Sequence, residues 1–344
     1  MRRFFALLLC LCLLPCCALS EAATMPPVPT LEPLPAEPMR VLITAAGDCT
    51  LGGEVKTGID KRFIRCADEN GLDYFFANVR DIFSDDDLTI VNLEGPLTTA
   101  TKRASKKYVM RGDPSYAGIL SGSSVEIANL ANNHTLDFGE QGYQDTLAAL
   151  DASGVAAAGA DSLYIVEKEG CRIGFIGYEK WNYSATDAIN GVTAARAQCD
   201  LLIVSVHWGE EYDYTAETSQ QKLGRALIDA GADLVIGHHP HVIQGVEQYQ
   251  GKYIIYSLGN FCFGGNVNPS DQDCYIFQQE FLFDDSGAIG GGIRIIPCAI
   301  SSSKSTNNYQ PTPLDGEAAE KLMNRVLDLS DLDSPVWLEN TADN

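Results

Sequence analysis

The chain has 344 residues, of which 24 are Lys or Arg and 46 are Asp or Glu, so its formal net charge at pH 7 is −22. A surface this acidic repels the phosphates of nucleic acids and the headgroups of anionic membranes, and we therefore expect no nucleic-acid partner. The same charge is compatible with a cation site and with solubility outside the cell.

Residues 1–24 are predicted to be a signal peptide. Arg2 and Arg3 form a positive end, and the apolar run that follows at 4–14 is shorter than the roughly 20 residues of a membrane-spanning helix. Small residues at 18–20 resemble a cleavage site. We expect an exported protein, extracellular or associated with the cell envelope. Cleavage is favoured, and a retained N-terminal anchor or a lipoprotein is the alternative.

Three further regions follow. Residues 25–38 are rich in proline, which disfavours helix and central strand, and are predicted to be an extended linker. Residues 39–300 have the composition of one globular α/β domain. Residues 301–344 are rich in Ser, Asn and Asp and are expected to form a peripheral tail with a short helix near 316–329.

Short apolar runs alternate with helical stretches along the domain, which indicates a layered α/β sandwich. The predicted strands lie at 40–46, 88–93, 125–130, 163–167, 172–178, 201–206, 234–237 and 253–258. The predicted helices lie at 74–83, 114–121, 143–152 and 218–230. Later strands near 274–283 and 292–300 would give the sheet antiparallel edges.

All five histidines follow one of the apolar runs. They are His134, His207, His238, His239 and His241. Ligands of open α/β sheets bind in the crevice beyond the carboxyl ends of the strands. Imidazole is the commonest metal ligand and the usual acid or base near neutral pH. The placement of histidine therefore predicts a functional site at the strand ends.

Carboxylates and amides follow strands in the same way. Asp48 lies in a glycine-flanked turn, and Glu94 lies just past the second predicted strand. Asn132 and Asn133 directly precede His134. Carboxylates, amide oxygens and imidazoles together are the ligand set of a divalent metal ion such as Mn, Zn, Fe or Mg. We expect such an ion here, with His134 or His207 as the acid or base.

Several polar residues near these motifs are expected to contact a substrate, namely Asn132, Glu210 and Asn260. Of Glu210 and Glu211, one is expected to point inward and the other into solvent. The basic run at 102–107 is expected to be a solvated loop, and contact with an anionic substrate is the alternative.

Seven cysteines remain after the four in the signal peptide are set aside from the total of eleven. Because seven is odd, they cannot all pair within one chain. No two are spaced as Cys-x-x-Cys, so a structural zinc site is not expected. Disulfides are open to an exported protein, but the sequence does not define a pairing.

Six ordered segments carry a resemblance to a known family. They are GDCTLGG at 47–53, NLEGPL at 92–97, NLANNHTLDFGEQG at 129–142, HWGEEY at 207–212, GHHPHVIQGVE at 237–247 and YSLGNF at 256–261. Over residues 40 to 300 the sequence resembles the bacterial capsule-synthesis CapA family of poly-γ-glutamate biosynthesis, whose domain is similar to the calcineurin-like metallophosphoesterases. The resemblance implies a four-layer α/β/β/α sandwich of the metallo-dependent phosphatase type, with a metal-type site at the strand ends.

The resemblance also assigns site positions. Those of the metal site are occupied by Asp48, Glu94, Asn133, His134, His207, His239 and His241. His238 competes with His239, because the segment GHHPH fits the phosphoesterase pattern Gly-His-x-His with either first histidine. The phosphoesterases begin with Asp-x-His, whereas this chain has Asp48-Cys49-Thr50, and they use a bridging Asp where Glu94 stands. A mononuclear or altered site is therefore implied as one outcome.

Two functions follow from this resemblance. The first is a role in the synthesis, assembly or export of an extracellular polymer, with an anionic polymer or the capsule-synthesis machinery at the membrane as partner. The alternative is a divalent-metal-dependent hydrolase or phosphoesterase that acts on an extracellular substrate. The missing Asp-x-His pattern favours the first function, and the full histidine set favours a working site.

Overall fold

The computed structural model describes residues 39–159, 163–168, 170–284, 287–333, 335 and 337–338. The predicted signal peptide and proline-rich linker lie outside these residues. Within the described ranges, no helix combines the length and the apolar character that crossing a membrane requires.

The first sheet is built around a long central strand. Its strands are β1 (Met39–Thr50), β3 (Leu88–Leu93), β5 (Ile127–Asn129), β6 (Ala156–Ala158), β13 (Asn260–Phe263), β14 (Asp273–Asp284), β15 (Gly287–Gly290), β16 (Ile293–Ala299) and β17 (Thr312–Pro313). Their spatial order is β17-β16-β14-β1-β3-β5-β6, with β13 beside β1 and β15 beside β14. Because β14 runs antiparallel to β1 and β16 antiparallel to β14, this side of the sheet is antiparallel, as predicted.

The second sheet has a parallel centre. Its strands are β7 (Tyr164–Lys168), β8 (Cys171–Glu179), β9 (Leu201–His207), β10 (Leu234–His238), β11 (Val246–Tyr249) and β12 (Lys252–Ile255), in the order β11-β12-β10-β9-β8-β7. Strands β8, β9, β10 and β12 run parallel, and β7 and β11 pair antiparallel at the two edges. A small separate ribbon joins β2 (Gly53–Glu54) to β4 (Met110–Arg111).

Among the described residues, six helices cover the outer faces of the sheets, namely α1 (Asp60–Asn70), α2 (Arg80–Ser84), α3 (Ala117–Ser121), α4 (Gly139–Ala152), α5 (Ala185–Arg196) and α6 (Thr218–Asp229). A further helix, α7 (Gly316–Asp328), packs on the cluster between the sheets, and the 3₁₀ turns are η1 (Leu72–Tyr74) and η2 (Pro114–Tyr116). Helices α1–α4 pack on the first sheet through residues such as Phe63, and α5 and α6 pack on the second through Val192 and Leu227.

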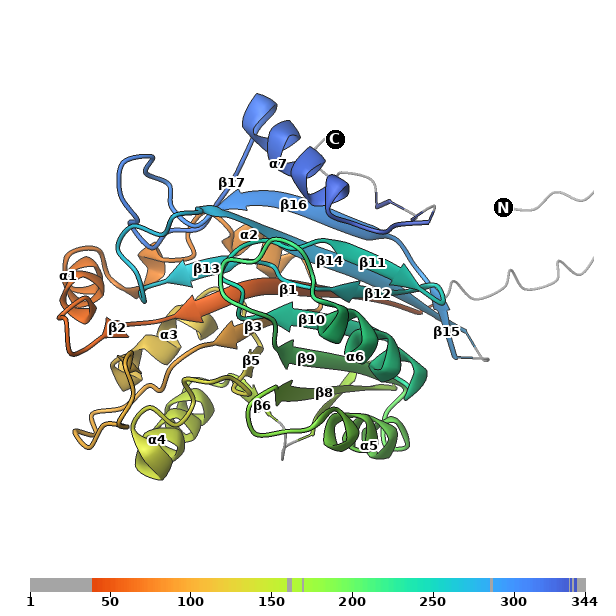
Figure 1. Cartoon of the computed structure of the whole chain (residues 1–344), viewed down its shortest axis with the longest axis horizontal. Helices are drawn as coiled ribbons and strands as arrows, with labels where there is room; N and C mark the ends of the chain where they lie inside the picture. The colour runs from red at the N-terminus through yellow and green to blue at the C-terminus, as the bar shows by residue number, and fades with distance from the viewer. Residues whose placement is uncertain are drawn as a thin grey trace, which may run out of the picture. The chain divides into compact units, whose positions relative to one another are not determined.

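A third apolar cluster lies between the two sheets. It joins Ile43 and Ile90 of the first sheet to Ile203 and Ile236 of the second, all of them buried. Together with the two helix layers, this cluster makes the fold a four-layer α/β/β/α sandwich (Figure 1), which confirms the predicted fold class.

The prediction of a helix at 74–83 was wrong. Buried aromatic residues recur there at helical spacing, but the chain forms η1, a turn over 75–79 and then the short α2. Helix α1 was not predicted because it is mostly charged and buries only Asp60, Phe63 and Ala67. Helix α5 was also missed, although Ser184 and Asp187 form a capping box at its start.

The segment expected to be a peripheral tail contributes to the core. Leu322 and Val326 of α7 are buried in the cluster between the sheets. After α7, the backbone of Asp331 donates to Val246 O and accepts from Gln248 N, so the chain continues along the edge of β11. The described part of 301–344 therefore belongs to the folded unit.

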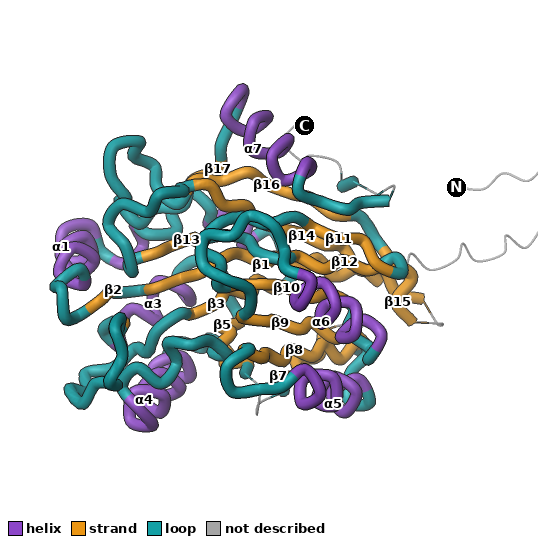
Figure 2. The backbone as a smooth tube through the Cα atoms, in the orientation of Figure 1, coloured by secondary structure: helices purple, strands orange, loops and turns teal. Residues whose placement is uncertain are grey.

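The carboxyl ends of the central parallel strands face one way. In Figure 1 the arrowheads of β1, β3, β8, β9 and β10 point to the same side, and Figure 2 shows long loops gathered there. The histidine-bearing segments all lie at these ends: His207 and His238 are the last residues of β9 and β10.

Candidate metal centre and adjoining cavity

Strand register aligns polar residues at the end of each sheet. In the first sheet Asp48 of β1 pairs with Asn92 of β3, which in turn pairs with Asn129 of β5. In the second sheet His238 of β10 pairs with His207 of β9, which pairs with Glu179 of β8. Two rows of polar side chains thus lie at the ends of otherwise apolar strands.

A backbone irregularity aims Asp48 into the site. The register of β1 against β3 shifts between Ala46 and Asp48, as at a β-bulge, which redirects the side chains that follow. Gly47 is required at this shift, because a Cβ there would lie 2.1 Å from the carbonyl oxygen of Gly259. The Asp48 amide donates to the same carbonyl at 3.0 Å.

The turn after β10 holds two histidines in the left-handed region. His239 has φ of 100° and His241 has φ of 58°, on either side of Pro240. Residues other than glycine rarely adopt such angles, and strain of this kind concentrates at functional sites. The turn directs both imidazoles towards Glu94, whose nearest His241 nitrogen lies 3.8 Å away.

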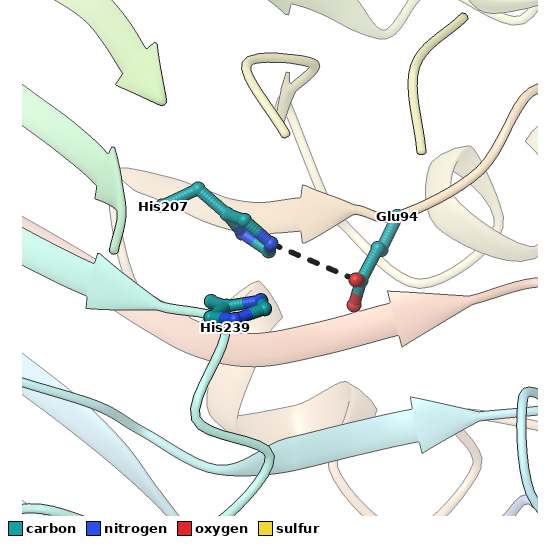
Figure 3. Close-up of side chains that lie close together, drawn as sticks. All are labelled: Glu94, His207 and His239. Carbon is teal, nitrogen blue, oxygen red and sulfur yellow. Dashed lines mark ion pairs between the residues drawn. The ribbon is translucent and has the colours of Figure 1, made fainter. Parts of the chain in front are cut away.

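Glu94 lies at the middle of the cluster. Its Oε1 is 3.6 Å from His207 Nε2, 3.8 Å from His241 Nε2 and 3.9 Å from His134 Nε2. Figure 3 shows the Glu94 carboxylate facing the rings of His207 and His239. These distances exceed hydrogen-bond lengths. Both Glu94 oxygens and His207 Nε2 are buried without a hydrogen-bond partner.

Two groups of side chains have the spacing of metal ligands, and Glu94 belongs to both. One consists of Glu94, His207 and His239, and the other of Asp48, Glu94 and His241, with ligand atoms within 4.8 Å of one another in each. All of these residues are buried. His238 belongs to neither group; its Nδ1 lies 3.3 Å from Asp48 Oδ1.

This donor set fits a divalent cation. Ligands about 2.0–2.2 Å from one ion stand roughly 3–3.5 Å apart, which is close to the separations around Glu94. Buried polar atoms without partners are costly, and a cation among them would remove that cost. Carboxylate and imidazole together suit Mn, Zn or Fe better than Mg, which prefers oxygen ligands alone.

The surroundings set the charge of each histidine. Burial and the nearby His239 hold the pKa of His207 well below its ordinary value. Burial and His241 lower the pKa of His239 to about 3, so both rings keep a free nitrogen lone pair at neutral pH. Burial opposes the charging of His241, but Glu94 and Asp48 raise its pKa to about 9.

The pKa values of the two buried carboxylates, Glu94 and Asp48, shift in opposite directions. Burial raises the pKa of Glu94, although His241 partly opposes this. Burial acts in the same direction on Asp48, but the neighbouring His238 and His241 hold its pKa well below the ordinary value. Asp48 is therefore ionised at neutral pH, and the charge of Glu94 depends on a positive neighbour.

His134 is oriented by a residue that the sequence did not single out. Its Nδ1 lies 2.7 Å from Asp137 Oδ2, which leaves Nε2 turned towards Glu94. Asp137 is fully buried, accepts from Met110 N at 2.5 Å and has Lys106 Nζ 2.5 Å from its other oxygen. Burial nevertheless lowers the pKa of His134.

Two asparagines position the ligands. Asn92 is fully buried and donates to Asp48 Oδ1 at 2.8 Å, while its Nδ2 lies 3.3 Å from His207 Nδ1. Asn260 Oδ1 lies 2.9 Å from His241 Nδ1, and its Nδ2 donates to the carbonyl of His241. Both stand in segments that the sequence marks, but the role of Asn92 becomes visible only from strand register.

A cavity of about 870 Å³ adjoins the cluster. His239 is the residue that the cavity wall shares with the candidate ligand groups. Of the residues expected to contact substrate, Asn132 and Glu210 line this cavity, whereas Asn260 is buried against His241. Asn133 also lines it, with Oδ1 buried and without a hydrogen-bond partner.

Glu210 and Glu211 are both exposed and both line the cavity, so the expectation that one of them points inward was wrong. Glu210 forms an ion pair with Lys180 at 2.7 Å. Cys49 and the other six cysteines of the described residues are free thiols.

These features define a class: a four-layer α/β/β/α protein with a strand-end cluster of carboxylates and imidazoles. The family model described as "Bacterial capsule synthesis protein PGA_cap" matches residues 42–265. The chain therefore belongs to this capsule-synthesis family.

Known relatives agree with that assignment. The chain is 33% identical over 224 residues to "PGA biosynthesis protein CapA" of Bacillus subtilis, which covers 58% of this chain and 59% of that one. It is 30% identical over 298 residues to "Capsule biosynthesis protein CapA" of Bacillus anthracis, covering 76% of this chain and 68% of that one. The match thus spans about three fifths of the B. subtilis relative.

Among solved structures, the chain is similar to the calcineurin-like phosphoesterase YfkN from Bacillus subtilis. The TM-score is 0.46 at 14% sequence identity, and the match covers 85% of this chain and 97% of that one.

Proposed function

We propose that the protein holds a divalent metal ion at its strand ends and acts outside the cytoplasm in the synthesis, assembly or export of a capsule polymer of the poly-γ-glutamate type. Membership of the capsule-synthesis family supports the biological role. The observation that carries the metal site is Glu94, whose two buried oxygens have no hydrogen-bond partner and face three histidine nitrogens.

When bound, a divalent cation supplies a Lewis acid that polarises a carbonyl or phosphoryl oxygen. Glu94 would hold it with His207 and His239 in one ligand group, and with Asp48 and His241 in the other. Asp137 fixes the His134 ring so that Nε2 can give or take a proton at the edge of the cluster.

The proposed partner is an anionic polymer or the membrane machinery that makes it. The formal net charge of −22 repels such a polymer over most of the molecule. A local cation would offset that repulsion at the strand ends. This site would then be the place where an anionic chain approaches the protein.

Metal analysis tests the proposal. The full chain, purified without chelator, should contain a divalent metal by elemental analysis, and Glu94→Gln should lose most of it because it takes one carboxylate from both ligand groups. Deletion of the gene in the native host should reduce surface polymer. A metal-free protein that binds no added Mn, Zn or Fe would reject the metal centre.

A second function, metal-dependent hydrolysis, is favoured by the pair of His134 and Asp137 beside an open cavity. The test is turnover of phosphoesters and γ-glutamyl peptides by the metal-loaded protein. Asp137→Asn should lower the turnover number by roughly ten- to a thousandfold with little change in metal content, because it releases His134 and leaves both ligand groups intact. Equal rates with and without metal would count against hydrolysis.

A further inference from the structure

We propose that the cavity beside the candidate metal centre binds a neutral saccharide, with a sugar ring lying on Trp181. This inference takes only the position of the candidate metal centre from the proposed function, and the recognition surface shares only His239 with the candidate ligand groups. It is formed mainly by the loop between β5 and α4, the start of α4, the loop after β8 and the loop after β9.

Trp181 is a fixed aromatic surface in this cavity. Its side chain is 48% exposed, although large aromatic residues are usually buried. The backbone amide of Trp181 donates to Glu179 Oε2 at 2.7 Å, and its ring packs against His239 with centroids 4.7 Å apart and planes at 76°. A held but exposed indole beside a candidate reactive centre marks a binding surface.

The cationic side chains at the cavity are already paired. Lys106 Nζ lies 2.5 Å from Asp137 Oδ1 and donates to the carbonyl of Asn133 at 2.7 Å. Lys180 is paired with Glu210 at 2.7 Å. A carboxylate or phosphate on the outer part of a ligand would therefore meet no unpaired cation among these residues.

The wall carries hydrogen-bond acceptors besides groups that can donate, such as the side chains of Thr135 and Asn182. Glu140 and Glu211 are exposed carboxylates, and Asn133 Oδ1 is a buried oxygen without a hydrogen-bond partner. A ligand that satisfies them must bring many donors and also an apolar face for the indole. A sugar ring has both, because its hydroxyls point outward around a face of C–H groups.

An organic cation fits less well, although the acidic wall would attract it. The ammonium of Lys180 already lies 4.9 Å from the centroid of the Trp181 ring. A second cation on that ring would be repelled by the first. The exposed face of Trp181, the acceptors of the cavity wall and the paired state of the nearby lysines together favour a neutral sugar over a polyanion or a polycation.

Isothermal titration calorimetry tests the inference on the full, metal-loaded chain, because its signal does not depend on the tryptophan that is replaced. Neutral trisaccharides, namely chitotriose and maltotriose, should give a saturable heat of binding for at least one of the two. Trp181→Ala should abolish it or weaken binding roughly tenfold or more, while Trp181→Tyr should retain most of it. Trp337→Ala is the matched control, because Trp337 is similarly exposed at 44% and does not line the cavity.

Titrations with other ligands, together with metal analysis, show whether the saccharide inference or the proposed metal centre fails. Saturation by oligo-γ-glutamate, uridine monophosphate or trilysine with no response to either trisaccharide would overturn the saccharide inference. So would an equal loss in Trp181→Ala and Trp337→Ala, or no response to any ligand by protein that contains metal. Sugar binding by protein that takes up no metal would support this inference and reject the proposed metal centre instead.

Discussion

Glu94 links the two candidate ligand groups, and this sharing allows the groups to be separated by mutation. His207→Ala removes a ligand from one group only, and His241→Ala from the other only. If both groups bind an ion, each variant should lose about half of the metal, and Glu94→Gln should lose nearly all. Elemental analysis of purified proteins measures this.

His238→Ala is the control for that series. It removes an equally buried imidazole from the same turn, but His238 lies outside both groups, so metal content should stay close to that of the wild type. Complete metal loss in His207→Ala alone would show a mononuclear centre. Loss in His238→Ala as large as in His241→Ala would contradict the assignment.

Metal uptake should release protons at neutral pH. Without metal, the charges of Glu94 and Asp48 raise the pKa of His241 to about 9, so its ring is protonated at pH 7. A metal ligand must be deprotonated, and binding therefore displaces about one proton from His241 and a further proton from the fraction of Glu94 that its raised pKa, about 8, leaves protonated. Apparent affinity should rise at least about tenfold per pH unit between pH 6 and 8 and level off above about pH 9.

Calorimetric titration in buffers of different protonation enthalpy measures the proton release. His239 should contribute none, since burial and His241 lower its pKa to about 3. A metal affinity that does not change from pH 6 to 8, together with no proton release, would show that His241 is not a ligand.

The sequence was enough to predict the candidate metal ligands, but not the residues that position them. Asp48, Glu94, His207 and His241 could be identified because polar ligands stand out after apolar strands. Asn92, Asp137 and Trp181 could not be identified in this way, because asparagine, aspartate and tryptophan occur in ordinary turns and cores. Strand register positions Asn92, the turn from His134 to Asp137 positions Asp137, and the loop after β8 positions Trp181.

At the scale of elements, two leucines of α7 allow a test of whether this helix contributes to the stability of the core. Leu322 is 2% exposed and packs between the sheets, whereas Leu327 is 38% exposed on the same helix. Leu322→Ala should lower the free energy of unfolding by about 2–5 kcal/mol through lost burial and a cavity. Leu327→Ala should change it by no more than about 0.5 kcal/mol, because an exposed side chain contributes little.

Urea unfolding of both variants, with metal content held equal, measures the difference. Equal stability of the two would mean that α7 is peripheral, as the sequence had predicted. That prediction relied on composition, and the polar residues of 301–315 masked the apolar spacing of Leu322 and Val326 in the helix.

The strands were easier to predict than the helices for a physical reason. Strands buried on both faces, such as β3 and β9, are mostly apolar and stand out in the sequence. Helices that cover a sheet need only a narrow apolar side. In α1 only three of eleven residues are buried, so tertiary packing rather than local pattern determines where it forms.

At the scale of the whole molecule, the candidate metal ligands at the strand ends come from both sheets. Asp48 and Glu94 come from the first sheet, and His207, His239 and His241 come from the second sheet and the turn that follows it. A bound ion would therefore join the two sheets. Metal should raise the melting temperature of the wild type by several degrees at saturating concentration, and much less in Glu94→Gln.

Thermal melts with and without added metal, at equal protein concentration, measure that linkage. A stability increase of the same size in Glu94→Gln would place the responsible metal elsewhere on the acidic surface. No change in the wild type, despite stoichiometric uptake, would mean that the unfolded chain binds the ion equally well.

We further propose that the protein is exported in its native host, since Arg2 and Arg3 precede a short apolar run and small residues follow it. N-terminal sequencing of native material should give a mature start near Glu21, and fractionation should find the protein outside the cytoplasm. Leu9→Arg, which puts a charge in the apolar run, should block export, while Val28→Arg in the linker should not. A chain that starts at Met1 in the soluble cytoplasmic fraction would refute the proposal, and the capsule role would then have to begin inside the cell.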